Sequence, residues 1–377
     1  MDATTRPDPD RPRVAVIFGG RSGEHSISCV TAAGVLRAID RTAYDVVPVG
    51  ITETGRWVLA ADDPSRWELQ GEELPTVTPD EGSGVVMPLE VGVHELTVLE
   101  PGEFPRALAG IDVVLPLLHG PFGEDGTVQG LLELADLRYV GSGVLASALS
   151  MDKHYMKVVL DAAGIPVGEH VLVTARRWER QREAVYADVE ELGYPVFVKP
   201  ARAGSSLGIS KVKGPADLEA AIEEARQHDP KVVVEATVIG REVECAVLES
   251  LDGSAPATSL PGEIVVRGGH EFYDFRAKYL DESSVDLVCP ADLPEDVVHR
   301  IRELAARTFE VLDCEGLARV DFFVRPDGSV VVNEINTMPG FTPVSMYPRM
   351  WQETGLSYPE LVDRLIRLAL ARRTGLR

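Results

Sequence analysis

The chain has 377 residues, which is long enough for two or three domains, and 45% of them are hydrophobic, so a large core is expected rather than general disorder. Its 37 Lys and Arg residues against 60 Asp and Glu residues give a formal net charge of −23, which argues against nucleic acid or an anionic membrane as the main partner. An anionic ligand would therefore need a local cluster of basic residues or a metal ion.

The sequence shows no membrane span, no secretory signal and no paired-cysteine motif. No apolar run reaches the roughly 18 residues that span a bilayer, and residues 1–13 are too polar for a secretory signal. The cysteines Cys29, Cys245, Cys289 and Cys314 are scattered and form no CxxC pair. We therefore expect reduced thiols and a cytoplasmic protein, not a disulfide scaffold or a zinc cluster.

The first part of the chain alternates between strand and helix patterns. In chain order we predict a strand at 13–18, a helix at 26–40, strands at 44–51 and 112–118, and a helix at 127–135. This order is typical of a parallel sheet with helices on its faces, and such sheets bind ligands beyond the carboxyl ends of their strands. Glycine-rich loops at 19–25 and 119–126 follow strands at that position, whereas residues 52–107 give no clear pattern.

The second part combines helices with strands that are close in sequence. We predict a helix at 146–163, strands at 194–199 and 209–212, a helix at 216–227, strands at 231–235 and 242–249, a helix at 293–312 and a last helix from about 358. The connection that contains Gly240 is a candidate domain boundary. Residues 262–290 are long, charged and aromatic, so a functional lid is expected there.

A hairpin is predicted at 316–336, because Arg-Pro-Asp-Gly-Ser at 325–329 is a turn signal between two β-rich runs. With residues 326–329 as the loop, the predicted pairs are Arg325–Val330, Asp321–Glu334 and Arg319–Asn336. Side chains alternate along a strand, so the last four of these residues share one face. The opposite face carries apolar residues that suit a core, namely Val320, Phe322 and Ile335.

The opposed carboxylates of Asp321 and Glu334 indicate a metal site. Like charges directly opposite each other on neighbouring strands are destabilising, and a divalent cation would relieve the conflict. Oxygen ligands suit Mg²⁺, which takes one or two carboxylates together with substrate phosphates. The alternative is a structural ion-pair cluster in which Arg319 neutralises the acids. We favour metal binding, because Asn336 adds a third oxygen ligand that an ion-pair cluster does not need.

Two lysines and a glycine loop are candidates for phosphate binding. Lys199 ends an apolar strand, and Lys153 lies near the start of a helix. The loop at 204–208 follows Lys199 and could bring backbone N–H groups to phosphate oxygens, although it is not a Walker A loop and a plain hairpin turn is the alternative. Together with the hairpin carboxylates, these groups point to ATP and phosphoryl transfer.

Other candidates are weaker when they are taken singly. Glu235 and Glu242 could hydrogen-bond a base and ribose, or be solvated surface residues. Within the expected lid, Lys278 offers a charge for phosphate and Phe272 an apolar face for a ring, although each suits a structural role as well.

The two N-terminal glycine loops carry one candidate each. Glu24 could grip an ammonium group, or only stabilise the start of a helix as an acid near its N-terminus. His119 could contact a substrate, or be a loop histidine whose hydrogen bonds are satisfied within the protein.

The combined motifs resemble those of the D-alanine–D-alanine ligases of the ATP-grasp superfamily, over nearly the whole chain from about Val14 to Leu368. The matching segments are 19–25, 118–130, 141–153, 272–279, 318–321 and 333–340. The resemblance implies an α/β and α+β protein with an N-terminal parallel-sheet domain and two antiparallel-sheet domains that clamp ATP. We place the domains at 1–150, 151–236 and 237–377.

The resemblance also implies a two-step reaction that supplies peptidoglycan precursors. The carboxylate of a first D-alanine takes the γ-phosphoryl group of ATP and becomes an acyl phosphate, and the amine of a second D-alanine then attacks that carbonyl. The cofactors implied are ATP and two Mg²⁺ ions, with Mn²⁺ as a possible substitute. The implied partners are the small-molecule substrates and a second copy of the chain in a homodimer.

By this resemblance, each site residue has an expected role. Glu24 would bind the ammonium of the first D-alanine and share a network with Ser205 and Tyr279, with His119 nearby. The developing oxyanion would face Arg319 and the N–H of Gly340, and the second D-alanine would meet Ser345 and Met346. The phosphates would meet Lys153, Lys199, Ser206 and Lys278, and the adenosine would lie among Glu235, Val238, Glu242 and Phe272. The metal ligands would be Asp321, Glu334 and Asn336.

Two other functions remain as alternatives. One is the same enzyme class with D-lactate or D-serine as the second substrate. The hydroxyl of Tyr279 favours the dipeptide, because related ligases that make D-alanyl-D-lactate often carry Phe at that place. The other is a nucleotide-binding regulator that has lost catalysis, which the intact set of lysines, Arg319 and hairpin acids argues against.

Overall fold

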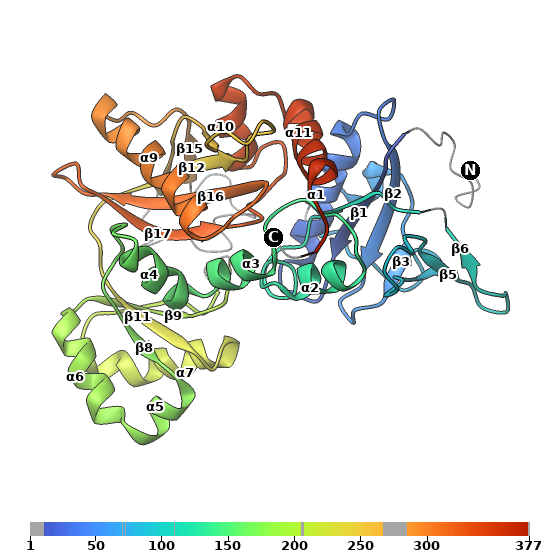
Figure 1. Ribbon diagram of the computed structural model, residues 1–377. Coiled ribbons are helices and arrows are strands. Elements are labelled where there is room, and N and C mark those ends of the chain that lie inside the picture. Colours follow the sequence, from blue (N-terminus) through green and yellow to red (C-terminus); the bar gives the residue numbers. More distant parts are fainter. Residues whose placement is uncertain are drawn as a thin grey trace.

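The computed structural model describes residues 11–69, 71, 73–108, 110–204, 207–266 and 285–375. Three sheets are built from consecutive parts of the chain (Figure 1). The first sheet is mixed and the other two are antiparallel, which confirms the predicted fold class. Within the described residues, no helix is both long and apolar enough to cross a membrane.

The first sheet has a parallel centre made by the strands that the sequence predicts. The strands β1 (Arg13–Gly19), β2 (Asp45–Ile51) and β7 (Val113–Pro116) run parallel, with β1 in the middle. Helices α1 (His25–Ala38) and α2 (Thr127–Leu134) follow β1 and β7. Each of these elements lies within two residues of its predicted bounds. Every residue of β1 is buried, as expected for a strand covered on both faces.

Residues 52–107, which gave no clear pattern, extend this sheet. Four short strands add to β2 in antiparallel order. They are β3 (Trp57–Leu59), β4 (Gly84–Val86), β5 (Thr97–Leu99) and β6 (Arg106–Ala107), with a 3₁₀ turn at Pro64–Trp67. Runs of two or three residues are too short for a period-two pattern to mark them, which is why the sequence did not indicate them.

The second sheet has four antiparallel strands in the order β10-β9-β11-β8. Their bounds are β8 (His170–Val173), β9 (Val196–Pro200), β10 (Ser210–Val212) and β11 (Val232–Ala236). Its apolar core is shared with the helices α5 (Ala175–Arg180), α6 (Arg182–Leu192) and α7 (Leu218–His228), the last preceded by a 3₁₀ turn at Pro215–Asp217. Of these elements, β8, α5 and α6 were not predicted.

The predicted helix at 146–163 is two helices, which is a correction. Helix α3 (Val144–Met151) ends and α4 (Lys153–Ala162) begins around Asp152, whose backbone is extended (φ −89°, ψ 101°). The Asp152 carboxylate accepts hydrogen bonds from the N–H groups of His154 and Tyr155, so it caps α4. It also pairs with Lys231 at 2.6 Å, which links the start of α4 to β11.

The third sheet is antiparallel and carries the predicted hairpin. Its strands are β12 (Arg241–Leu248), β13 (Ala257–Thr258), β14 (Gly262–Val266), β15 (Val285–Val288), β16 (Leu317–Val324) and β17 (Val330–Asn336). The described ends of the expected lid, β14 and β15, pair with each other in this sheet, and residues 267–284 lie outside the described part. Helix α9 (Glu295–Val311) packs on one face of the sheet.

The hairpin register is as predicted at the acids and differs at the turn. Asp321 pairs with Glu334 and Arg319 with Asn336. The predicted pair Arg325–Val330 is wrong, because Val324 pairs with Val330 and the turn is one residue longer on that side. A bulge between Asp321 and Phe322 restores the register, since it takes up one extra residue of β17.

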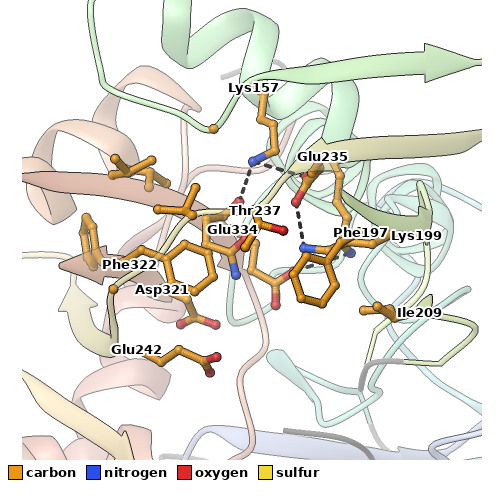
Figure 2. Close-up of a pocket in the computed structure, with 18 of the residues that line it drawn as sticks. Lys157, Phe197, Lys199, Ile209, Glu235, Thr237, Glu242, Asp321, Phe322 and Glu334 are labelled. Atoms are coloured by element: carbon orange, nitrogen blue, oxygen red, sulfur yellow. Dashed lines mark hydrogen bonds and ion pairs between the residues drawn. The ribbon is translucent and has the colours of Figure 1, made fainter. Parts of the chain in front are cut away.

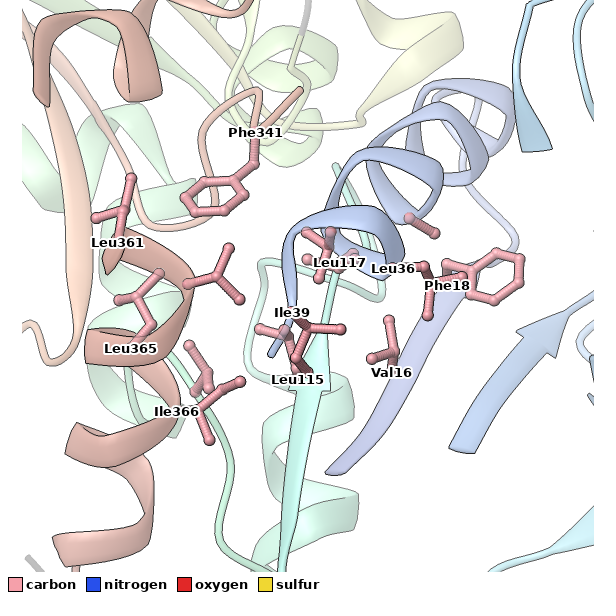
Figure 3. Packing of buried hydrophobic residues seen from close by; sticks show 14 of the residues in the cluster. Val16, Phe18, Leu36, Ile39, Leu115, Leu117, Phe341, Leu361, Leu365 and Ile366 are labelled. Carbon is pink, nitrogen blue, oxygen red and sulfur yellow. The ribbon is translucent and has the colours of Figure 1, made fainter. Parts of the chain in front are cut away.

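The end of the chain returns to the first sheet. Helices α10 (Met346–Thr354), which was not predicted, and α11 (Tyr358–Ala371) share one apolar core with β1, β7 and α1. Figure 3 shows Leu361, Leu365 and Ile366 of α11 facing side chains of α1 and β7. The hydroxyl of Tyr44 also donates to Asp363 at 2.7 Å. The first sheet therefore has its core completed by the last helix.

Candidate active site

A cavity of about 340 Å³ lies between the second and third sheets. That volume is in the range of pockets that hold small-molecule ligands. One wall comes from α4, β9 and β11, and the other comes from β12, β16 and β17. Each wall carries both charged and apolar side chains. Figure 2 shows Lys157, Lys199, Glu235 and Phe197 on the first wall, and Asp321, Glu334 and Phe322 on the second.

Three lysine ammonium groups gather around the buried carboxylate of Glu235 and the half-buried carboxylate of Glu334. Glu235 accepts a hydrogen bond from Lys199 Nζ at 2.7 Å, and its other oxygen lies 3.3 Å from Lys157 Nζ, so it sits between the two cations (Figure 2). Lys153 Nζ donates to the carbonyl of Ala203 at 2.9 Å and lies 3.4 Å from Glu334. Such a cluster can receive phosphate oxygens without the cost of burying isolated charges.

The pKa values of this cluster follow from burial and from pairing. Burial alone would raise the pKa of Glu235, but Lys157 and Lys199 lower it well below its usual range. For Lys199 burial would lower the pKa, and Glu235 outweighs it, so the pKa is raised. Burial lowers the pKa of Lys157, and Glu235 opposes this only in part. The carboxylate and Lys199 are therefore held as an ion pair.

The secondary structure explains why Lys153 reaches this place. Asp152 caps α4, so Lys153 is the first residue of the helix, at its positive end. Lys157 follows one turn later and also faces the cavity. Lys157 donates to the carbonyl of Asn333 at 3.2 Å, which connects α4 to β17 across the cavity.

Arg319 and the hairpin acids form the opposite wall. Arg319 makes a two-pronged contact with Asp321, at 2.7 and 2.8 Å, and lies 3.2 Å from Glu244 of β12. The amide nitrogen of Asn336 donates to Asp321 at 3.0 Å. Burial would lower the pKa of Arg319, but Asp321 and Glu244 raise it well above its usual value. Arg319 is thus a fixed positive charge beside the cavity.

Asp321, Glu334 and Asn336 carry the oxygen donors that a magnesium ion needs. Asp321 and Glu334 are adjacent in register and both line the cavity. Asn336 carries an amide oxygen as well as its nitrogen, and rotation of the amide would present that oxygen instead. In the described part of the chain, no group of three or more His, Cys, Asp or Glu is placed to hold a metal. Two carboxylates and an amide fit an ion that completes its shell with phosphate oxygens and water.

The apolar part of the cavity offers a place for a flat ring. Phe197, Ile209 and Val238 line it, and Glu242 lies at the edge beside β14 (Figure 2). Glu235 of the lysine cluster lies on the same strand that leads to Val238. Among the described residues, Glu235, Val238 and Glu242, which were predicted to bind the nucleoside, thus line one cavity with Lys153 and Lys199.

Glu24 and His119 lie together at the carboxyl ends of β1 and β7. The Glu24 carboxylate lies so close to Gly120 and Gly204 that a Cβ at these positions would be 2.6 and 3.0 Å from its oxygen. Gly120 has a φ of +71°, a backbone conformation that favours glycine, and the approach of Glu24 brings the N-terminal loops to the loop after β9. His119 is buried, and burial lowers its pKa although Glu24 opposes this.

The turn after β17 carries three further predicted residues. A Cβ at Gly340 would be 3.3 Å from the Ser345 hydroxyl oxygen, so the two are neighbours. That oxygen accepts from the N–H of Thr342 at 3.1 Å. Met346 buries its side chain in the core against Gly262.

Several predicted residues lie outside the described part of the chain, namely Ser205, Ser206, Phe272, Lys278 and Tyr279. The structure also adds charged residues to the site that the sequence reasoning did not single out. They are Lys157, Glu124 and Glu244. The spacing of four residues from Lys153 was an available signal for Lys157. Nothing in the sequence distinguishes Glu124 and Glu244 from acidic residues on the surface.

A parallel-centred sheet beside two antiparallel sheets that enclose a cavity of lysines and carboxylates defines an enzyme of the ATP-grasp class. Family models described as the N-terminus and the C-terminus of D-ala D-ala ligase match residues 13–142 and 159–367. The chain belongs to the D-alanine–D-alanine ligase family.

Relatives match over nearly the full length. A D-alanine–D-alanine ligase from Kineococcus radiotolerans is 64% identical over 373 residues, covering 97% of this chain and 99% of the relative. One from Pseudarthrobacter chlorophenolicus is 61% identical over 368 residues, covering 97% and 96%. Two solved structures are each 36% identical with a TM-score of 0.81: the D-alanine-D-alanine ligase from Coxiella burnetii, and the VanG D-Ala:D-Ser ligase from Enterococcus faecalis. They cover 96% of this chain, and 95% and 100% of the respective structures.

Proposed function

We propose that this chain is an ATP-dependent ligase that joins two D-alanine molecules to D-alanyl-D-alanine, which serves peptidoglycan precursor synthesis. The observation that carries the proposal is the continuity of two regions. The cavity of lysines and hairpin acids contacts Gly204, and Gly204 also packs against Glu24 of the N-terminal loops. A nucleotide phosphate and an amino acid bound in these regions would be neighbours.

The residues divide the chemistry between them. Lys153 and Lys199 balance the negative charge of the ATP phosphates, while Glu24 binds the ammonium of the first D-alanine. The carboxylate of that D-alanine then accepts the γ-phosphoryl group of ATP, and ADP is the leaving group. Arg319 and the N–H of Gly340 stabilise the oxyanion that forms when the amine of the second D-alanine attacks the acyl phosphate. This intermediate collapses to the dipeptide when the amine has lost a proton and inorganic phosphate leaves. Enclosure of the cavity protects the acyl phosphate from water.

The second D-alanine needs its own contacts. We assign its carboxylate to Ser345 and to the backbone of Met346, which begins α10. A network of Glu24 with Ser205 and Tyr279 completes the site, and the contacts of the lid with ATP come from Phe272 and Lys278. Ser206 adds a hydroxyl to the phosphate lysines.

We assign the nucleoside to the apolar part of the cavity, with Glu235, Val238 and Glu242 around it. Asp321, Glu334 and Asn336 would hold two Mg²⁺ ions, for which Mn²⁺ could substitute. The ions supply charge neutralisation and orientation of the phosphates. The role of Lys157 is to hold Glu235 in place, since its ammonium lies 3.3 Å from that carboxylate.

We assign D-alanine as the second substrate, in preference to D-serine. The overall fold does not separate it from D-serine, because one solved D-Ala:D-Ser ligase and one D-alanine-D-alanine ligase are equally similar to this chain. Relatives that are 53%, 61% and 64% identical to this chain are named D-alanine–D-alanine ligases, which favours D-alanine. We further propose a cytoplasmic homodimer, following the family resemblance. Light scattering at micromolar concentration tests the dimer.

The test of the activity is ADP release with ATP and Mg²⁺, with products identified by mass. The protein is supplied with D-alanine alone, L-alanine alone, or D-alanine with D-lactate or D-serine. We expect release with D-alanine alone and a dipeptide product. Release only with one of the mixtures would move the assignment to the corresponding ligase. No release with any of them would refute the ligase function and favour a nucleotide-binding regulator.

A further inference from the structure

The turn after β17 is tied to the glycine-rich loop after β7 through a single peptide unit. The N–H of Met338 donates to Glu124 Oε1 at 3.2 Å. The carbonyl of the same residue lies 3.1 Å from His119 Nδ1. Both partners belong to residues 119–126, more than two hundred positions earlier in the chain, as the sequence separations of 214 and 219 show. Both backbone polar groups of Met338 thus contact the loop that follows β7 of the first sheet.

Glu124 joins this contact to the Glu24 side of the site. Its second oxygen, Oε2, accepts from the N–H of Gly120 at 2.6 Å. Gly120 in turn packs against the Glu24 carboxylate, with the 2.6 Å approach described above for a Cβ at that position. The contacts therefore run from Glu24 through Gly120 and Glu124 to Met338, two residues before Gly340.

We propose that Glu124 is a positioning residue that fixes the distance between the Glu24 carboxylate and the N–H of Gly340. The inference rests on the proposed function, in which these two groups bind opposite ends of the reacting D-alanine. Positioning matters because a misplacement of about 1 Å can cost on the order of a hundredfold in rate. Glu124 is suited to this task because a carboxylate has two oxygens and can accept both N–H bonds at once.

The contacts of Glu124 separate this role from nucleotide binding, because its two oxygens accept from the backbone N–H groups of Gly120 and Met338. It lines a small cavity of about 30 Å³ beside Lys153, Gly204 and Asn336, and it is not part of the lining of the larger cavity. Loss of the contact should therefore change turnover and leave ATP binding as it is. A residue that only supported the fold would change both.

The neighbouring residue offers a matched control. Asp125 also accepts two backbone N–H groups, from Phe122 at 2.9 Å and Thr127 at 3.0 Å, but both donors lie within three residues of it in the chain. Glu124→Gln and Asp125→Asn make the same chemical change at adjacent positions. Gln keeps one acceptor oxygen, and its NH₂ group cannot accept the second N–H. The two variants thus differ in whether a bond between the two loops is lost.

The experiment measures kcat for D-alanine-dependent ADP release, the ATP dissociation constant without D-alanine, and amide hydrogen exchange of the peptide that covers residues 337–341. For Glu124→Gln we expect kcat to fall about tenfold to a hundredfold, unchanged ATP binding and faster exchange in that peptide. Asp125→Asn should stay within about twofold in kcat, as surface changes usually do. Restoration of more activity by Glu124→Asp than by Glu124→Ala would support a role for the carboxylate.

Three outcomes of the kinetic and ATP-binding measurements would overturn the inference. They are an unchanged kcat in Glu124→Gln, an equal loss of kcat in both variants, or a parallel loss of ATP binding and turnover. Unchanged exchange at residues 337–341 would refute the contact itself, whatever the activity. A wild-type protein that forms no product refutes the proposed function instead, and the exchange measurement still decides whether Glu124 holds the turn.

Discussion

Truncation of Ile366 should destabilise the core that α11 shares with the first sheet. Ile366 is fully buried in that core. Ile366→Ala removes about three methylene equivalents at ~0.8 kcal/mol each, about 2.4 kcal/mol. A residual cavity of about 50 Å³ adds ~1.2 kcal/mol at ~24 cal/mol per Å³. We therefore expect the free energy of unfolding to fall by about 3.5 kcal/mol, and by about 1 kcal/mol for Ile366→Val.

Urea unfolding followed by tryptophan fluorescence provides the assay. Trp67 lies in the shared core, and Trp178 lies in the separate core of the second sheet. The chain has four tryptophans. In backgrounds that keep only Trp67 or only Trp178, with the other three replaced, the Trp67 transition should shift and the Trp178 transition should shift less. Val344→Ala is the control, because that side chain is 76% exposed. A loss below about 1 kcal/mol for Ile366→Ala would refute the shared core, and equal shifts would contradict two separate cores.

Three further changes test the site and its supports. Glu334→Gln should fold normally and lose Mg²⁺-dependent turnover, because it removes a charge with little change in volume; normal turnover across a Mg²⁺ titration would contradict the metal assignment. Asp152→Ala should cost at least about 1 kcal/mol as a lost cap and also free Lys231, and an unchanged melting temperature would contradict the capping role. Burial lowers the pKa of His119 below its usual 6.5. As the pH falls, His119 is therefore protonated in the unfolded chain before it is protonated in the folded one, so the free energy of unfolding should decrease below pH 6.5. His119→Gln should reduce this fall in urea midpoints between pH 7.5 and 5.5, and an equal fall in the variant would refute the contribution.

The hairpin shows both the strength and the limit of sequence reasoning. Alternation placed the acids on one face with the correct partners, Asp321 with Glu334. The prediction missed two irregularities that offset each other. The turn is one residue longer than predicted, and a bulge takes up one extra residue of β17. The period-two pattern does not reveal the bulge, because residues 330–332 are all valine and hide the change of phase between Val332 and Ile335, which both face the core.

Burial of charge was the second limit. Lys157 reads as an ordinary helix-surface lysine, and only the packing of α4 against β11 and β17 shows that its side chain is 1% exposed and paired with Glu235. The break at Asp152 was missed for a related reason. Capping depends on which backbone N–H groups the carboxylate reaches, and the apolar pattern of α3 and α4 continues across it.

The shared core also has a consequence for synthesis of the protein on the ribosome. The strand β7 ends at Pro116, and the helix that covers its face begins only at Tyr358. At ~5–20 residues per second, translation takes on the order of 10–50 s to cover that interval. During this time the nascent first sheet exposes the apolar face that α11 later buries. The N-terminal part therefore cannot finish folding first, and a chaperone that shields this face until release would act on it more than on the second sheet, whose core is complete by residue 234.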